Sequence, residues 1–148
     1  MLAHSITLKV FSEFEEDADE IKSTLENLIP FDLKKEKVDL RQKSVFGFNQ
    51  KKIKIFQVNL TKKRQVRLFL QRLNKSLTSE EKSKIIQELS NRLDEELNLF
   101  LRFDKKELIE NNKFLLTDHG NCFHLKINIA AFPKKRNIAM EQINSIFY

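Results

Sequence analysis

Residues 123–129 have the sequence Phe-His-Leu-Lys-Ile-Asn-Ile, in which large apolar side chains alternate with polar ones. Successive side chains of a β-strand point to opposite faces of a sheet. The four apolar residues therefore face one way, and His124, Lys126 and Asn128 face the other. A sheet with one polar face is covered on one side only, which is typical of antiparallel or mixed sheets.

The rest of the chain supplies further strand patterns and the helices to cover such a sheet. Strands are expected at 6–10, 37–43, 53–60 and 97–103, and a hairpin is expected to join 114–116 to 123–131. Helical spacing of apolar residues occurs at 21–29, at 62–77 and from Thr78 onward, and Pro133 is expected to open a last helix. The predicted fold is α+β with two layers, a mostly antiparallel or mixed sheet and helices covering one face.

Length and composition place limits on the class of protein. A chain of 148 residues with 41% hydrophobic residues, 13 Phe and no linker is expected to form one domain over 1–148. No apolar run approaches the roughly 18 residues of a membrane span, and the first residues lack a basic stretch followed by an apolar block, so secretion is not expected. A single cysteine, Cys122, excludes an internal disulfide and fits a reducing compartment, so a cytoplasmic location is expected.

Charge is distributed unevenly along the chain. Residues 34–75 contain 14 Lys and Arg but only two Asp and Glu, whereas the first 33 residues are acidic. Such a block indicates a polyanionic partner, with nucleic acid first and an anionic membrane second. The alternative is a solvated basic face that only keeps the protein soluble.

Two predicted helices begin with cations, at Thr61-Lys62-Lys63-Arg64 and at Pro133-Lys134-Lys135-Arg136. The first turn of a helix already has a positive potential, so each cation there is unfavourable by about 0.3–1 kcal/mol. A bound phosphate would convert both starts into binding sites. Since each follows a predicted strand, we expect both corners at the same edge of the sheet. The alternative is that solvent screens these cations.

Other basic residues extend this pattern. Arg67 and Lys75 lie on one stripe of the second helix, where they could follow phosphates. Lys51 and Lys52 belong to a hairpin loop that also contains Phe46 and Phe48. Aromatic residues on a basic loop can stack on unpaired bases, although we expect at least one of this pair to be packed instead.

No motif for catalysis is present. With two glycines the chain has no phosphate-binding glycine loop, and no Ser/His/Asp constellation is identifiable. His119-x-x-Cys122-x-His124 lacks the paired spacings of a zinc site. We therefore expect no enzymatic activity, no cofactor and no metal.

Two stretches resemble a family of small archaeal RNA-binding proteins described as exosome-associated. Residues 99–105, Leu-Phe-Leu-Arg-Phe-Asp-Lys, are similar to the family's L-x-L-R-x-D-K strand ending. Residues 125–136 resemble its last strand, followed by an aromatic residue, a proline and a basic helix start. The opening at 4–8 and the order of elements also match, so the resemblance covers essentially the whole chain.

The resemblance implies an α+β RNA-binding module linked to RNA processing, with a fold similar to that of the ribosomal protein that binds the small ribosomal RNA of the large subunit. Its matched basic positions are Arg102, Lys105, Lys134 and Arg136. Lys106 and Asn111-Asn112 depart from the Gln and the Gly-rich segment of many relatives.

The sequence therefore predicts a non-catalytic RNA-binding protein that contacts the phosphate backbone through its basic corners and is linked to RNA processing or degradation. The alternative is a protein-interaction subunit that docks on an RNA-processing complex through its basic face. The expected RNA-binding residues are Lys51, Lys52, Lys62, Lys63, Arg64, Arg67, Lys75, Arg102, Lys105, Lys134, Lys135 and Arg136.

Overall fold

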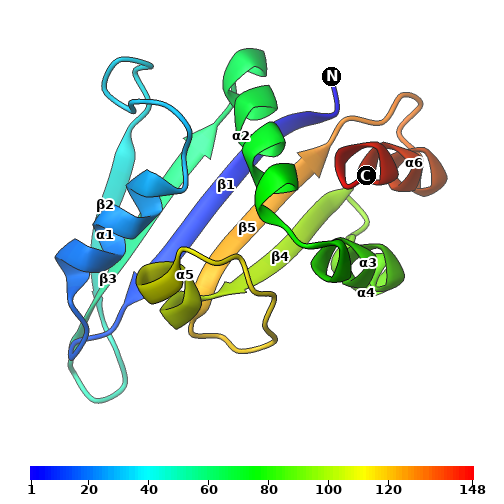
Figure 1. The fold of residues 1–148 in the computed structure, drawn as a ribbon. Helices are drawn as coiled ribbons and strands as arrows, with labels where there is room; N and C mark the ends of the chain where they lie inside the picture. The colour runs from blue at the N-terminus through cyan, green and yellow to red at the C-terminus, as the bar shows by residue number, and fades with distance from the viewer.

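The computed structural model describes residues 1–148 and contains five strands and six helices (Figure 1). The strands are β1 (Ala3–Ser12), β2 (Leu40–Phe46), β3 (Lys52–Leu60), β4 (Asn98–Asp104) and β5 (Cys122–Ile129). The helices are α1 (Ala18–Asn27), α2 (Lys63–Ser76), α3 (Ser79–Gln87), α4 (Leu89–Arg92), α5 (Lys105–Asn111) and α6 (Arg136–Ile146). Each helix is too short or too polar to traverse a lipid bilayer.

The strands form one sheet in the order β2-β3-β1-β5-β4, and every neighbouring pair is antiparallel. β1 is therefore the central strand, and β5 lies between β1 and β4. The helices pack on one face of the sheet, with α2 running across its middle (Figure 1). The predicted α+β architecture with two layers is confirmed, and the sheet is antiparallel throughout.

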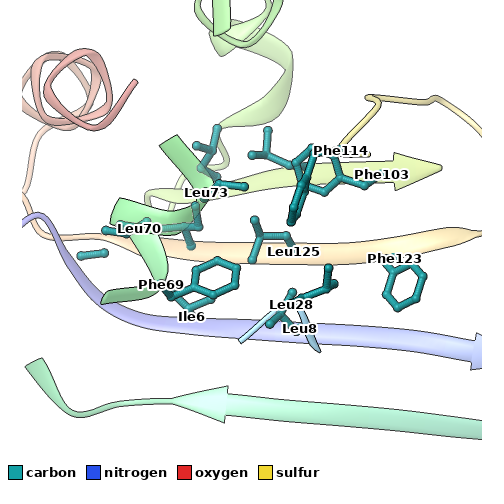
Figure 2. Close-up of a cluster of buried hydrophobic side chains, with 14 of the residues drawn as sticks. Ile6, Leu8, Leu28, Phe69, Leu70, Leu73, Phe103, Phe114, Phe123 and Leu125 are labelled. Atoms are coloured by element: carbon teal, nitrogen blue, oxygen red, sulfur yellow. The ribbon is translucent and has the colours of Figure 1, made fainter. Parts of the chain in front are cut away.

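A continuous apolar core of 34 buried residues fills the space between the sheet and the helices. From α2, the predicted apolar stripe contributes Phe69, Leu70 and Leu73, which lie over Ile6 of β1 and Leu125 of β5 (Figure 2). The alternation expected in β5 is present, because Phe123, Leu125, Ile127 and Ile129 are buried while Lys126 is exposed. This burial fixes which face of every strand is free of helices.

The expected hairpin between 114–116 and β5 is wrong, because β1 and β4 occupy both edges of β5. Residues 115–117 lie instead along β4: Asp104 N donates to Leu115 O and Thr117 N donates to Arg102 O. The Phe114 ring packs edge-on against Phe103, with ring centroids 5.1 Å apart. Core packing on β4 has thus taken the place of local pairing.

Candidate nucleic-acid interface

The face of the sheet that carries no helices, here called the open face, is rich in cations. Alternation along the strands directs five Lys and Arg side chains to it, namely Lys9, Arg41, Lys43, Arg102 and Lys126. Among the strand residues of this face the one carboxylate is that of Asp104, at the end of β4, which accepts a hydrogen bond from Glu107 N and caps α5. The open face therefore has a strong excess of positive charge.

Cross-strand pairing brings several of these residues into a line. Arg102 pairs with His124, His124 with Lys9, Lys9 with Gln57, and Gln57 with Arg41. These five residues, here called the basic row, cross all five strands. Since strands are about 4.8 Å apart, the backbone positions of its three cations are spaced by about 10 Å.

No carboxylate of the protein forms an ion pair with these cations. The four ion pairs of the structure are Lys51–Glu15, Arg64–Glu36, Arg92–Glu88 and Lys105–Glu16. None of them includes a cation of the open face. Arg102 makes a single hydrogen bond, from Nη1 to Asp118 O at 3.3 Å, which orients the side chain but does not neutralise it. The charge on this face remains available to an external anion.

His124 responds to the positive surroundings of the basic row. Burial lowers the pKa of His124 below its ordinary value, and the charges of Arg102, Lys9 and Lys105 lower it further, although a backbone hydrogen bond with Gly120 has the opposite effect. His124 is therefore neutral at neutral pH. Next to it, burial raises the pKa of the Cys122 thiol, whose Sγ lies 3.5 Å from His124 Nε2. A thiol with a raised pKa is a poor nucleophile.

Two aromatic side chains flank the basic row. Phe100 lies on one side of it, paired with Lys126, and Phe11 lies on the other. Together with Lys9, Arg102 and neighbouring residues they line a hollow of about 500 Å³ on the open face. The ring of Phe11 contacts His124 edge-on, with ring centroids 5.7 Å apart.

The start of α2, here called the α2 corner (residues 61–64), is basic, as its sequence predicts, and the structure shows that it has no side-chain cap. No side chain caps the helix at Lys62, and no acidic residue lies in its first turn. By contrast, Asp17, Thr78 and Asp104 cap α1, α3 and α5 through their side chains. Arg64 pairs with Glu36, so only Lys62 and Lys63 have free charges at this corner. Arg67 and Lys75 are exposed further along the helix.

The start of α6, here called the α6 corner (residues 133–136), differs from the expectation. The helix opens at Arg136 rather than at Pro133, with Lys135 at the uncapped N-cap position. Arg136 donates from Nη1 to Leu93 O at 2.9 Å and from Nη2 to Ser90 O at 3.0 Å, so its guanidinium binds carbonyls of α4 and the following residue. Lys134 and Lys135 remain exposed.

The two corners lie at the same end of the sheet, although the helix starts are separated. Ile6 of β1 pairs with Leu60 of β3 on one side and with Ile127 of β5 on the other, so β3 and β5 finish together. It is the C-terminal part of α6, however, that approaches α2, where Ser145 and Ile146 share a cavity with Lys63 and Arg67. With 11 residues, α6 is about 16 Å long, so its start does not lie at this contact.

Lys105 is the clearest correction among the predicted RNA-binding residues. Its side chain is buried and its Nζ donates to Phe11 O, Glu16 Oε1 and Asn121 Oδ1, at 2.7, 2.9 and 2.5 Å. It joins β4 and α5 to the end of β1, and it cannot reach an external ligand. Arg64 and Arg136, as described above, are likewise engaged within the protein.

The β2–β3 hairpin presents exposed aromatic residues beside its cations. Phe46 and Phe48 are 77% and 111% exposed, so the expectation that one of them packs into the core is wrong. Lys52 is exposed, and Lys51 Nζ lies 2.5 Å from Glu15 Oε1.

Sequence reasoning missed most of the open face. Lys9, Arg41, Lys43 and Lys126 were not among the expected binding residues, although the alternation around Lys9 and Lys126 places both opposite the core. The pairing that aligns Arg41 and Arg102 with Lys9 depends on strand order, which no local pattern contains.

Comparisons with known proteins agree with a nucleic-acid interface. The sequence model of a family described as RNA binding matches residues 5–129. A Pyrococcus abyssi protein named RNA-binding protein PAB1135 is 23% identical over 141 residues, which cover 95% of this chain and 91% of that protein.

Solved structures show the same fold. The protein AF2318 from Archaeoglobus fulgidus has a TM-score of 0.84 at 21% identity, covering 97% of this chain and 99% of its own. Mth689, a DUF54 protein from Methanothermobacter thermautotrophicus, has a TM-score of 0.79 at 27% identity and full coverage of both chains. Because the family's sequence model extends over most of the chain, from β1 to the end of β5, this protein belongs to the RNA-binding family that it describes.

Proposed function

We propose that this protein binds RNA without catalysis and holds the phosphate backbone on the open face of its sheet. The observation that carries the proposal is the set of five cations there, none of which has a carboxylate partner within the protein. Phosphate neutralisation by Lys and Arg supplies most of the non-specific affinity of proteins for nucleic acids. Family membership and the name of the Pyrococcus relative, an RNA-binding protein, support the choice of RNA.

The free cations of the two corners extend this surface at one end of the sheet. Lys62 and Lys63 lie where β3 finishes, and Lys134 and Lys135 lie beyond the end of β5. Both helix starts lack side-chain caps, so their backbone N–H groups are available to a phosphate. In this proposal the corners bind the backbone after it leaves the open face.

A role in RNA processing or degradation belongs to the same proposal and rests on the resemblance of residues 99–105 and 125–136 to exosome-associated proteins. A cytoplasmic location fits the free, buried thiol of Cys122.

The test is the salt dependence of binding to a fluorescently labelled single-stranded RNA, measured by anisotropy. We expect the logarithm of the association constant to fall by about 0.7 for each neutralised phosphate per tenfold increase in salt. The variant Lys9→Gln/Lys126→Gln should lose affinity and reduce that slope by about 1.4.

The matched control is Lys22→Gln/Lys84→Gln, which removes the same charge from α1 and α3 in the helix layer. It should leave the slope unchanged. A flat salt dependence of the wild-type protein contradicts the proposal, as does an equal loss of affinity in both double variants. Retention of an acidic protein partner without any RNA binding would favour the protein-interaction alternative.

A further inference from the structure

The inference concerns Phe100, which is unusual among the residues of the open face. It is 44% exposed at the middle of β4, and the residues beside it on the open face are polar. No other ring stacks on it or meets it edge-on, unlike Phe11 and Phe103. The fold therefore leaves an aromatic surface without a partner.

The surroundings of Phe100 are those of a site for an aromatic anion. Its cross-strand neighbour is Lys126, and Arg102 follows two residues later on the same face of β4. All three residues line the hollow of about 500 Å³ together with Lys9 and Phe11. Small-molecule sites usually have volumes of about 300–1,000 Å³, so the hollow is large enough for a nucleotide.

We infer that the bound RNA is unpaired at this point and that one of its bases stacks on Phe100 while its backbone follows the basic row. This inference rests on the proposed function and names the class of RNA. A nucleobase combines a planar apolar face for the ring with a flanking phosphate for Arg102 and Lys126. In a duplex the base faces are stacked on one another and cannot reach the ring.

Phe11 is the weaker platform of the two. One ammonium, that of Lys9, already lies 5.5 Å from its ring centroid, and its contact with His124 fixes the ring edge-on. A base over Phe11 would have to displace Lys9. The principal contact is therefore assigned to Phe100.

The experiment compares three labelled probes by anisotropy: a 12-nucleotide single strand, the duplex formed with its complement, and an abasic strand of equal length. The protein variants are Phe100→Ala, Phe100→Tyr, which keeps an aromatic face, and Phe14→Ala. Phe14 is the matched control because it is 61% exposed, lies outside the strands among Glu13, Glu15 and Glu16, and has Lys51 Nζ 5.7 Å from its ring centroid rather than a cation of the open face.

Phe100→Ala should weaken single-strand binding about tenfold, within the range measured when a stacking aromatic residue is removed. Phe100→Tyr and Phe14→Ala should bind that strand as the wild-type protein does. The abasic strand and the duplex should bind less tightly than the single strand, and Phe100→Ala should not change their affinities. Unchanged duplex affinity also shows that Phe100→Ala is folded.

The outcomes separate this inference from the proposed function. If RNA binding is salt-dependent but Phe100→Ala binds the single strand as well as the wild-type protein does, the stacking inference is overturned and the proposed function stands. Duplex binding as tight as single-strand binding has the same meaning. If none of the probes binds in a salt-dependent manner, both are overturned.

Discussion

Leu125 and Lys126 are adjacent in β5, yet they belong to different environments. Leu125 is buried beneath the helices, whereas Lys126 is exposed on the open face. The same contrast holds along β1, where Leu8 is buried and Lys9 faces outward. The pleat thus divides each strand into one set of side chains that stabilises the fold and another that is free to bind a ligand, so the two properties should respond to different substitutions.

The largest effect is expected from the covered face. Leu125→Ala removes buried methyl groups and leaves a cavity, which should lower the free energy of unfolding by about 2–5 kcal/mol. Lys126→Ala should change it by no more than about 0.5 kcal/mol. Denaturant titration followed by circular dichroism measures both. A similar loss in the two variants would mean that the open face also contributes to stability.

Lys105→Met tests a cation that belongs to the covered side despite its charge. The substitution leaves Phe11 O, Glu16 Oε1 and Asn121 Oδ1 without their donor, so we expect the free energy of unfolding to fall by about 1–3 kcal/mol. The salt dependence of RNA binding should remain that of the wild-type protein. A less steep slope in the folded variant would instead place Lys105 among the phosphate-binding residues.

Substitutions at the helix corners should raise the free energy of unfolding instead of lowering it. Lys62 and Lys135 occupy N-cap positions with extended backbone, where Asp is a preferred residue. Lys62→Asp and Lys135→Asp should each raise the free energy of unfolding by about 1 kcal/mol and at the same time weaken RNA binding. Thermal unfolding and anisotropy give the two quantities. Stabilisation with unchanged RNA affinity would remove that corner from the proposed surface.

A smaller effect is expected from pH through His124. Because burial and the charges of Arg102 and Lys9 lower its pKa in the folded protein, the unfolded chain binds a proton at a higher pH than the folded one does. The stability contribution of neutral His124 is therefore present above pH 6.5 and is lost as the pH falls through the lowered pKa. His124→Asn should reduce this pH dependence in denaturant titrations; an unchanged dependence would assign it to other groups.

The parts of the fold that sequence predicted well are those governed by local periodicity. The period of two in β5 predicted which side of that strand is free of helices, and the helical spacing of apolar residues over 62–77 predicted α2 and its buried side. These features depend on neighbouring residues, so one stretch of sequence contains all the information that they need.

The remaining features depend on partners that are distant in sequence. Arg136 looks like a free cation until the carbonyls of Ser90 and Leu93 accept its hydrogen bonds. Lys105 looks exposed until Glu16 and Asn121 surround it. The basic row needs the pairing of five strands. The likeness to a ribosomal protein, which rests on sequence resemblance, stays a prediction.

Ligand binding by the basic row also requires the complete five-stranded sheet. Its members, at positions 9, 41, 57, 102 and 124, come from all five strands and are aligned only by the full set of cross-strand pairings. A nascent or truncated chain that lacks β5 carries nearly the same number of cations, yet without His124 and the two pairings of β5 the line is broken. Competence to capture a ligand would thus arise late, when the last strand inserts between β1 and β4.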